Sequence, residues 1–125
     1  MRTGIGLCAA MALLTACGQA DNQANTTTEI DAQMRAGQIS DGQTIVEAEC
    51  TTCHAVGTIG ESPRLDAPPL RYVLSNYDPE ALAEDFREGI HVGHPDMPDF
   101  DFGPQGTDAV IAYLQSIQVD QPAAE

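Results

Sequence analysis

Two thiols and an imidazole lie within one short run, Cys50-Thr51-Thr52-Cys53-His54. Two residues between the cysteines let both sulfur atoms form thioethers with the two vinyl groups along one edge of a haem. The adjacent histidine can then bind the iron from beneath, and this spacing is the pattern of a c-type haem attachment site. The run therefore predicts one covalently attached haem, with Cys50 and Cys53 as its attachment points and His54 as a ligand of its iron.

The same residues could form three other kinds of site. A thioredoxin-like redox pair also uses Cys-x-x-Cys, but it follows a strand in a βαβ unit, and the sequence predicts no such strand. A zinc site could recruit His91 or His94, although adjacent Cys53 and His54 cannot easily close one tetrahedron together. A disulfide within the motif would close so small a loop that it would stabilise the chain little. We therefore rank the haem site above these alternatives.

The chain begins like an exported protein. A basic residue, Arg2, precedes apolar or small residues at 4–14, a stretch too short to span a bilayer but typical of a secretory signal. The run Leu-Thr-Ala-Cys that ends at Cys17 resembles the bacterial lipoprotein box, where cleavage precedes the cysteine and its sulfur takes a lipid. We therefore expect residues 1–16 to be a lipoprotein signal peptide and Cys17 to anchor the chain on the periplasmic side of a membrane. Gly18 resembles lipoproteins sorted to an outer membrane, and the alternative for Cys17 is an incidental cysteine beside an ordinary cleavage site.

The charge limits the possible partners. The formal net charge is −14, and arginine is the only basic residue besides histidine because the chain contains no lysine. Such an acidic chain excludes nucleic acid as a partner, since the phosphate backbone would repel it. It favours a redox protein partner with a basic or neutral docking face, although charge that merely keeps the chain soluble is an equal alternative.

Composition divides the rest of the chain into a tether and one domain. Residues 17–38 are rich in Gln, Asn, Thr and Ala and predict a flexible tether. A folded domain is expected over residues 39–119, followed by a tail at 120–125. Ser40 and Gln43 have the spacing of a capping box, which predicts a first helix that starts there and runs into the Cys-x-x-Cys-His motif.

Two further helices follow a loop rich in glycine and proline between Gly57 and Leu70. Asp78-Pro79 predicts the start of the first of them, with apolar residues at helical spacing at Leu82, Phe86 and Ile90. The last helix is predicted to start near Thr107, with an apolar face made of Val110, Tyr113, Leu114 and Ile117. No segment alternates at a period of two residues, so the sequence predicts an all-α domain of three principal helices and loops.

The order of these features resembles the class I c-type cytochromes over roughly residues 38–119. In that family a helix runs into the haem motif, a proline loop follows, here Pro68-Pro69-Leu70, and a middle helix, a Met-Pro loop and a last helix complete the domain. The resemblance implies the cytochrome c fold around one haem c. It also implies a single-electron carrier and not an enzyme, because the haem supplies the redox chemistry.

The resemblance further implies two contacts and one more ligand. The carbonyl of Pro68 would accept a hydrogen bond from the ring of His54, and Gly42 would pack against Tyr113. Met97, which lies after the middle helix, would be the sixth ligand of the iron, and ligation by histidine and methionine raises the reduction potential. The alternatives are a core methionine at this position and ligation by His94 or, less favoured, His91.

The chain departs from the better-known members in its polar residues. It has no tryptophan to bind a haem propionate. The candidates for that role are Arg64, Arg71 and Tyr72. It also lacks the ring of lysines used by basic cytochromes, and acidic residues flank Met97 instead, namely Asp96, Asp99 and Asp101.

Other functions stay open at this point. A haem-based gas sensor or haem enzyme needs an open or displaceable sixth site on the iron, and a methionine at position 97 argues against one. The domain could also be the haem subunit of a larger oxidoreductase. A structural lipoprotein without haem is the remaining alternative.

Overall fold

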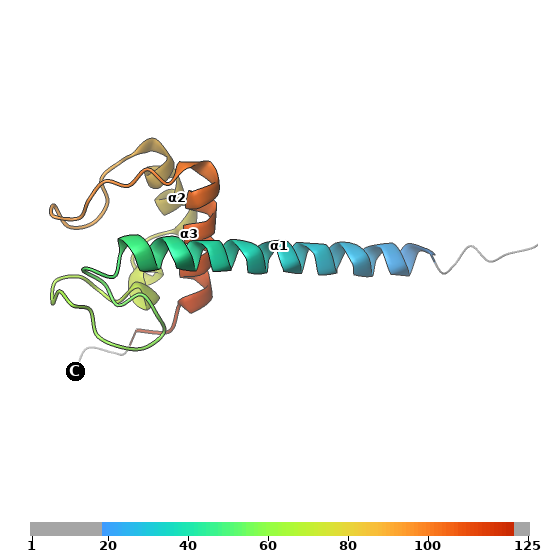
Figure 1. Ribbon diagram of the computed structural model, residues 1–125, viewed down its shortest axis with the longest axis horizontal. Coiled ribbons are helices and arrows are strands. Elements are labelled where there is room, and N and C mark those ends of the chain that lie inside the picture. The colour runs from blue at the N-terminus through green and yellow to red at the C-terminus, as the bar shows by residue number, and fades with distance from the viewer. Residues whose placement is uncertain (1–18, 122–125) are drawn as a thin grey trace, which may run out of the picture. The chain divides into compact units, whose positions relative to one another are not determined.

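The computed structural model describes the backbone of residues 19–121 and the side chains of residues 25–121. Four elements follow one another along the chain: α1 (Gln19–Glu49), the 3-10 helix η1 (Leu70–Ser75), α2 (Pro79–Glu88) and α3 (Gly103–Ile117) (Figure 1). The described residues contain no strand, so the prediction of an all-α fold is confirmed. The expected signal peptide and Cys17 lie outside the described residues.

The chain divides into two units, with the boundary between Asp31 and Ala32. In the first unit the described residues are helical, and the side chains from Asn25 to Asp31 are exposed. The second unit contains the remainder of α1 together with η1, α2, α3 and the loops. The buried apolar core lies in this second unit.

The first helix begins earlier than the sequence pattern predicted. The prediction of a helix start at Ser40 is wrong, because α1 passes through this residue and begins at Gln19. Within the helix, Gln43 Nε2 donates to Glu47 Oε1 at 2.7 Å instead of capping. Residues 19–38 contain no proline and are rich in alanine and glutamine, which favour helix. Their role as a tether stays a prediction.

The start and end of α2 follow the sequence signals. Asp78 Oδ1 accepts hydrogen bonds from the backbone amides of Glu80 at 3.1 Å and Ala81 at 3.0 Å, and Pro79 occupies the first turn. Gly89 ends the helix with a φ of 67°, a left-handed conformation that glycine adopts without strain. The predicted start at Asp78-Pro79 is confirmed.

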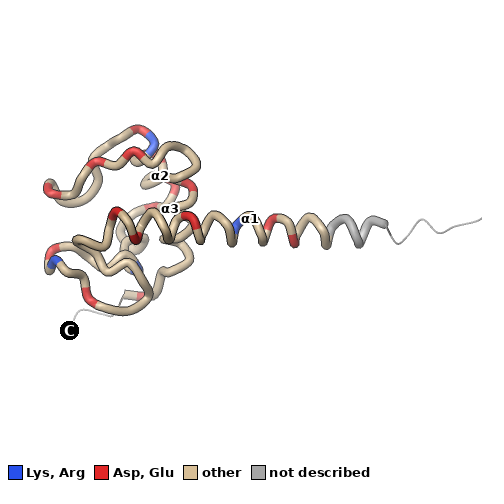
Figure 2. The backbone as a smooth tube through the Cα atoms, in the orientation of Figure 1, with Lys and Arg blue, Asp and Glu red and all other residues tan. Residues whose placement is uncertain are grey.

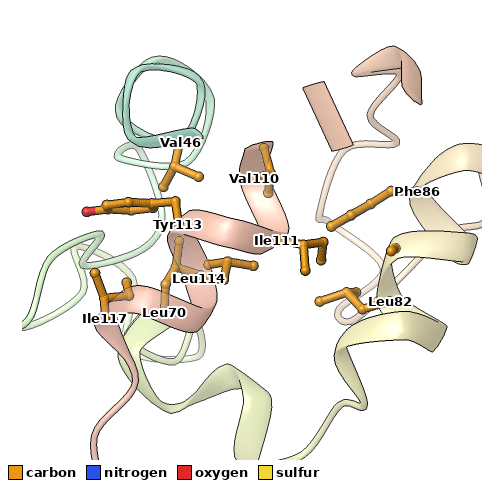
Figure 3. Close-up of a cluster of buried hydrophobic side chains, with 10 residues drawn as sticks. Val46, Leu70, Leu82, Phe86, Val110, Ile111, Tyr113, Leu114 and Ile117 are labelled. Atoms are coloured by element: carbon orange, nitrogen blue, oxygen red, sulfur yellow. The ribbon is translucent and has the colours of Figure 1, made fainter. Parts of the chain in front are cut away.

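The core forms around α3, with α2 on one side and Val46 of α1 and Leu70 of η1 on the other (Figure 3). The predicted apolar face of α3 is confirmed, since all four of its residues are buried, although this helix begins four residues before Thr107, at Gly103. Leu82 and Phe86 of α2 are buried as expected. Ile90 is exposed because it lies beyond the end of α2.

A glycine allows α1 and α3 to pack against each other. A Cβ atom at Gly42 would lie 1.9 Å from the carbonyl oxygen of Ala109 and 2.9 Å from Cβ of Tyr113. No side chain fits at that separation, so the expected contact between Gly42 and Tyr113 is confirmed. This contact holds the C-terminal part of α1, from which the Cys-x-x-Cys-His motif continues, against α3.

The last helix also fixes the loop after the motif and η1. The Tyr113 hydroxyl donates to the carbonyl oxygen of Val56 at 2.9 Å. Gln118 donates to the carbonyl oxygen of Leu70 at 2.9 Å and accepts from the amide of Leu74 at 3.1 Å. The loop after the motif is therefore bound to α3, and η1 is bound to the residue that caps the end of α3. In the part of the chain that the structure describes, no helix combines the length and hydrophobicity that crossing a bilayer requires.

The contact at Gly42 predicts a large effect of adding one methyl group. Gly42→Ala should lower the free energy of unfolding by about 3 kcal/mol, the upper part of the usual range for overpacking, because backbone atoms of α3 block the new Cβ. Gly37→Ala on the same helix is the matched control, since nothing lies within 4 Å of its Cβ position. The control should leave stability unchanged or raise it by up to about 1 kcal/mol. Denaturant titrations of the two variants that gave equal stabilities would contradict this packing.

Candidate functional site

One apolar cavity of about 550 Å³ lies in the second unit. This volume is in the range of sites that bind cofactors, about 300 to 1,000 Å³. Its walls come from α1, η1, α2 and α3, and from the loops at 50–69 and 89–102. The aliphatic and aromatic residues that line it include Val46, Leu70, Val73, Leu82, Phe86, Val92, Phe100, Phe102, Val110 and Leu114.

The three residues of the predicted haem motif line this cavity together. The amide of Cys50 donates to the carbonyl oxygen of Val46 at 2.9 Å, and the amide of His54 donates to that of Cys50 at 2.9 Å. The motif therefore continues from α1 as a helical turn. Positions three and four residues apart share one face of such a turn, so Cys53 and His54 lie on the same side as Cys50.

The environment of the cysteines does not suit a redox pair. No disulfide joins Cys50 and Cys53. Burial raises the pKa of Cys50 to about 11, with smaller contributions from Glu49 and Cys53. Redox cysteines need a lowered thiol pKa, because the thiolate is the reactive form, and here a helix and not a strand leads into the motif.

The zinc alternative also lacks support from the geometry. Among residues 25–121, no cluster of three or more His, Cys, Asp or Glu side chains is arranged to hold a metal ion. This absence does not bear on the predicted haem ligands His54 and Met97, because methionine is not one of these four residue types.

A hydrogen bond fixes the orientation and tautomer of His54. Its Nδ1 lies 2.7 Å from the carbonyl oxygen of Pro68, the contact that the family resemblance implied. A carbonyl oxygen can only accept, so Nδ1 carries the proton and Nε2 keeps the lone pair that a metal needs. The loop between these residues is held by the amide of Leu70, which donates to the carbonyl oxygen of Ala55 at 2.9 Å.

Met97 lines the same cavity from the loop between α2 and α3. Gly93 in that loop has a φ of 76°, and a Cβ there would lie 3.3 Å from the Met97 sulfur. Glycine thus leaves room for the thioether. Aromatic contacts anchor the end of the loop, since the ring of Phe102 meets that of Phe86 edge-on at 5.4 Å and stacks on that of Phe100 at 5.1 Å.

The two histidines of this loop differ in their availability to a metal. His94 lines the cavity, and its Nδ1 accepts from the amide of Asp96 at 3.1 Å. His91 does not line the cavity, and its Nδ1 and Nε2 lie 2.7 Å from Asp99 Oδ1 and 2.9 Å from the carbonyl oxygen of His94. The hydrogen bond to Asp99 raises the pKa of His91. Only His94 therefore remains an alternative to Met97.

Of the three residues predicted to bind a haem propionate, only Arg64 lines the cavity. Its guanidinium donates to both oxygens of Asp66, at 2.9 and 2.6 Å, and to Asp96 at 3.3 Å. Arg71 is buried elsewhere, where it donates to the carbonyl oxygen of Gly60 at 2.8 Å and its guanidinium lies 4.6 Å from the ring centre of Tyr72. The structure does not support the prediction for Arg71 and Tyr72.

Several polar side chains of the cavity were not predicted from the sequence, and Tyr77 is one of them. Tyr77 lines it, with its residue 38% exposed. Its phenol could reach a polar group at the edge of a bound ligand. No sequence pattern predicts this role, because a single tyrosine before a helix cap has no periodicity or motif around it.

The ion pair of Arg64 predicts the titration of Asp66. The hydrogen bonds from Arg64 lower the pKa of Asp66 from 3.8 to about 2. A lowered pKa in the folded state means that this contact stabilises the fold above pH 4 and is lost as the pH falls towards 2. In Arg64→Gln the pKa of Asp66 should return to near 3.8, whereas Arg87→Gln, which breaks the contact with Asp108, should leave it unchanged. Carboxyl NMR titration measures both, and a pKa near 4 in the unaltered protein would refute the contact.

Comparison with known proteins identifies the family. The model of the family described as cytochrome c oxidase, cbb3-type, subunit III matches residues 37–114, more than half of the chain. Neither the curated proteins nor the solved structures contain a match. The matched range includes the haem motif, Pro68 and Met97, and it confirms the resemblance to c-type cytochromes. The chain therefore belongs to the family of cytochrome c domains named for subunit III of cbb3-type oxidases, whose members bind haem c covalently.

Proposed function

We propose that this chain is a single-electron carrier with one haem c, attached to Cys50 and Cys53 and ligated by His54 and Met97. The observation that carries the proposal is that the motif and Met97, far apart in the sequence, line one apolar cavity. The contact with Pro68 leaves the lone pair of His54 on Nε2. When bound, the haem would supply the iron that takes up and releases one electron.

The residues of the cavity fit this group and this role. Two thiols lie beside the imidazole on one turn, and the remaining walls are mostly aliphatic and aromatic. These walls would exclude water, and a thioether ligand favours ferrous iron, so both raise the reduction potential. Electron transfer requires that the ligands of the iron be held in place, and it makes or breaks no bond of a substrate. The hydrogen bond that holds His54 and the apolar walls of the cavity suit this role, and they support a carrier rather than an enzyme.

The charges beside the cavity support a basic or neutral docking face on the redox partner. Asp66 and Asp96 line the cavity, and Asp99 and Asp101 lie in the same loop as Asp96, all four exposed. The guanidinium of Arg64 lies between Asp66 and Asp96 and offsets only part of this charge. Figure 2 shows acidic residues along the loops and helices, with few basic ones among them. Complementary charge on a partner would accelerate docking at this face.

Two alternative functions can be compared with the carrier. The matched family is named after an oxidase subunit, which favours a haem subunit of a larger oxidoreductase as the second candidate function. A gas sensor is less favoured, because a gas would need an open sixth site on the iron and the thioether of Met97 lines the cavity.

The ligand of the iron can be tested with two substitutions. Met97→Ala should abolish the far-red charge-transfer band that a methionine ligand gives ferric haem, and should lower the reduction potential. His94→Ala should keep both, because His94 is the alternative ligand. Absorption spectra and redox titrations of the two purified variants measure the effect. Loss of the band in His94→Ala but not in Met97→Ala would reverse the assignment.

Docking can be tested by its dependence on salt. The rate of electron exchange with a basic test protein should fall as ionic strength rises, because salt screens attraction between opposite charges. With an acidic test protein the rate should rise instead. Stopped-flow kinetics over a range of salt concentrations measures both slopes, and the reverse pattern would refute an acidic docking face.

We also propose that a lipid on Cys17 anchors the domain on the periplasmic side of a bacterial membrane, with the outer membrane slightly favoured by Gly18. The leader and the lipoprotein box in the sequence support this. Cys17→Ser should therefore move the haem-loaded protein from the membrane fraction to the soluble periplasmic fraction. A variant that stayed with the membranes would exclude Cys17 as the anchor.

A further inference from the structure

The loop that carries Met97 contains a histidine that is neither a cavity residue nor a candidate ligand. The two ring nitrogens of His91 lie 2.7 Å from a carboxylate oxygen of Asp99 and 2.9 Å from the carbonyl oxygen of His94. Both of these oxygens can accept a hydrogen bond from the ring. Two such partners favour the form of the ring in which both nitrogens donate, and the hydrogen bond to Asp99 raises the pKa of His91 in the same direction.

The two partners of His91 lie on either side of Met97 in the sequence. The carbonyl oxygen of His94 also accepts from the amide of Met97, at 2.8 Å. One nitrogen of the His91 ring thus binds the first residue of the turn that leads to Met97, and the other binds Asp99, two residues beyond the thioether. One side chain closes the turn from both ends.

We infer that His91 is a positioning residue for Met97, which it keeps directed into the cavity by closing the turn of residues 94–99. This inference rests on the proposed function, in which Met97 is the sixth ligand. The aromatic contacts of Phe100 and Phe102 anchor the loop only after this turn. The turn itself is mostly exposed, so its order depends on the hydrogen bonds within it.

Removal of these bonds should loosen the turn without unfolding the domain. Exposed charge pairs contribute little to global stability, and the core lies elsewhere. The turn would then open more often and release the sulfur from the iron more often. An added ligand that replaces methionine, such as imidazole, reports on this opening directly.

The test compares imidazole binding by the haem-loaded ferric protein and its variants. His91→Ala and Asp99→Asn should each bind imidazole about three- to tenfold faster, with a weaker far-red band, as the loss of exposed charge-assisted hydrogen bonds implies. The double variant should be no faster than His91→Ala. Arg87→Ala is the control, because it removes a cation paired with Glu84 and Asp108 on α2 and α3, and it should bind at the unaltered rate.

The outcomes separate this inference from the proposed function. An unaltered protein with covalent haem but no far-red band would refute ligation by Met97, and this inference with it. A normal band with unchanged imidazole binding in His91→Ala would overturn the positioning role alone, as would an equal increase in Arg87→Ala. If His91→Ala fails to load haem, Asp99→Asn, which keeps the size of the side chain, decides the result in the same way.

Discussion

α1 can lie against α3 only because residue 42 has no side chain. The carbonyl oxygen of Ala109 and Cβ of Tyr113 occupy the space that any Cβ would need. This contact sets where α1 ends, and therefore where Cys50, Cys53 and His54 face the cavity. Tyr113 extends the same support, since its hydroxyl binds the carbonyl oxygen of Val56 just after the motif. The position of the haem motif thus depends on one backbone approach between two helices.

The two sides of the cavity are built by different means. On the side of His54, an irregular loop is held by backbone hydrogen bonds, and the carbonyl oxygen of Pro68 selects the tautomer of the ring. On the side of Met97, aromatic rings hold the end of the loop against α2, and a glycine leaves room for the sulfur. Neither His54 nor Met97, the two proposed ligands, lies on a long helix. Each is placed by a loop whose ends are fixed to helices, which explains why so short a chain can enclose a large apolar cavity.

The sequence predicted those parts that depend on local patterns. The haem motif, the cap at Asp78 and the apolar face of α3 all follow from spacings within a few residues, and the structure contains them. The length of α1 could not be predicted, because residues 25–38 are exposed and lack the apolar period that marks a packed helix. The pairing of His91 with Asp99 and the place of Tyr77 in the cavity depend on how loops close in three dimensions, which no local pattern encodes.

The proposed function requires one covalent haem at Cys50 and Cys53. The most direct test is the pyridine haemochrome spectrum of the purified protein after extraction with acidified acetone, followed by mass spectrometry of the proteolytic peptide that contains both cysteines. We predict that the haem survives extraction, at one haem per chain, and that this peptide carries its mass. Haem that is extracted by the solvent, or a peptide with two free thiols from a host able to attach haem, would contradict the account.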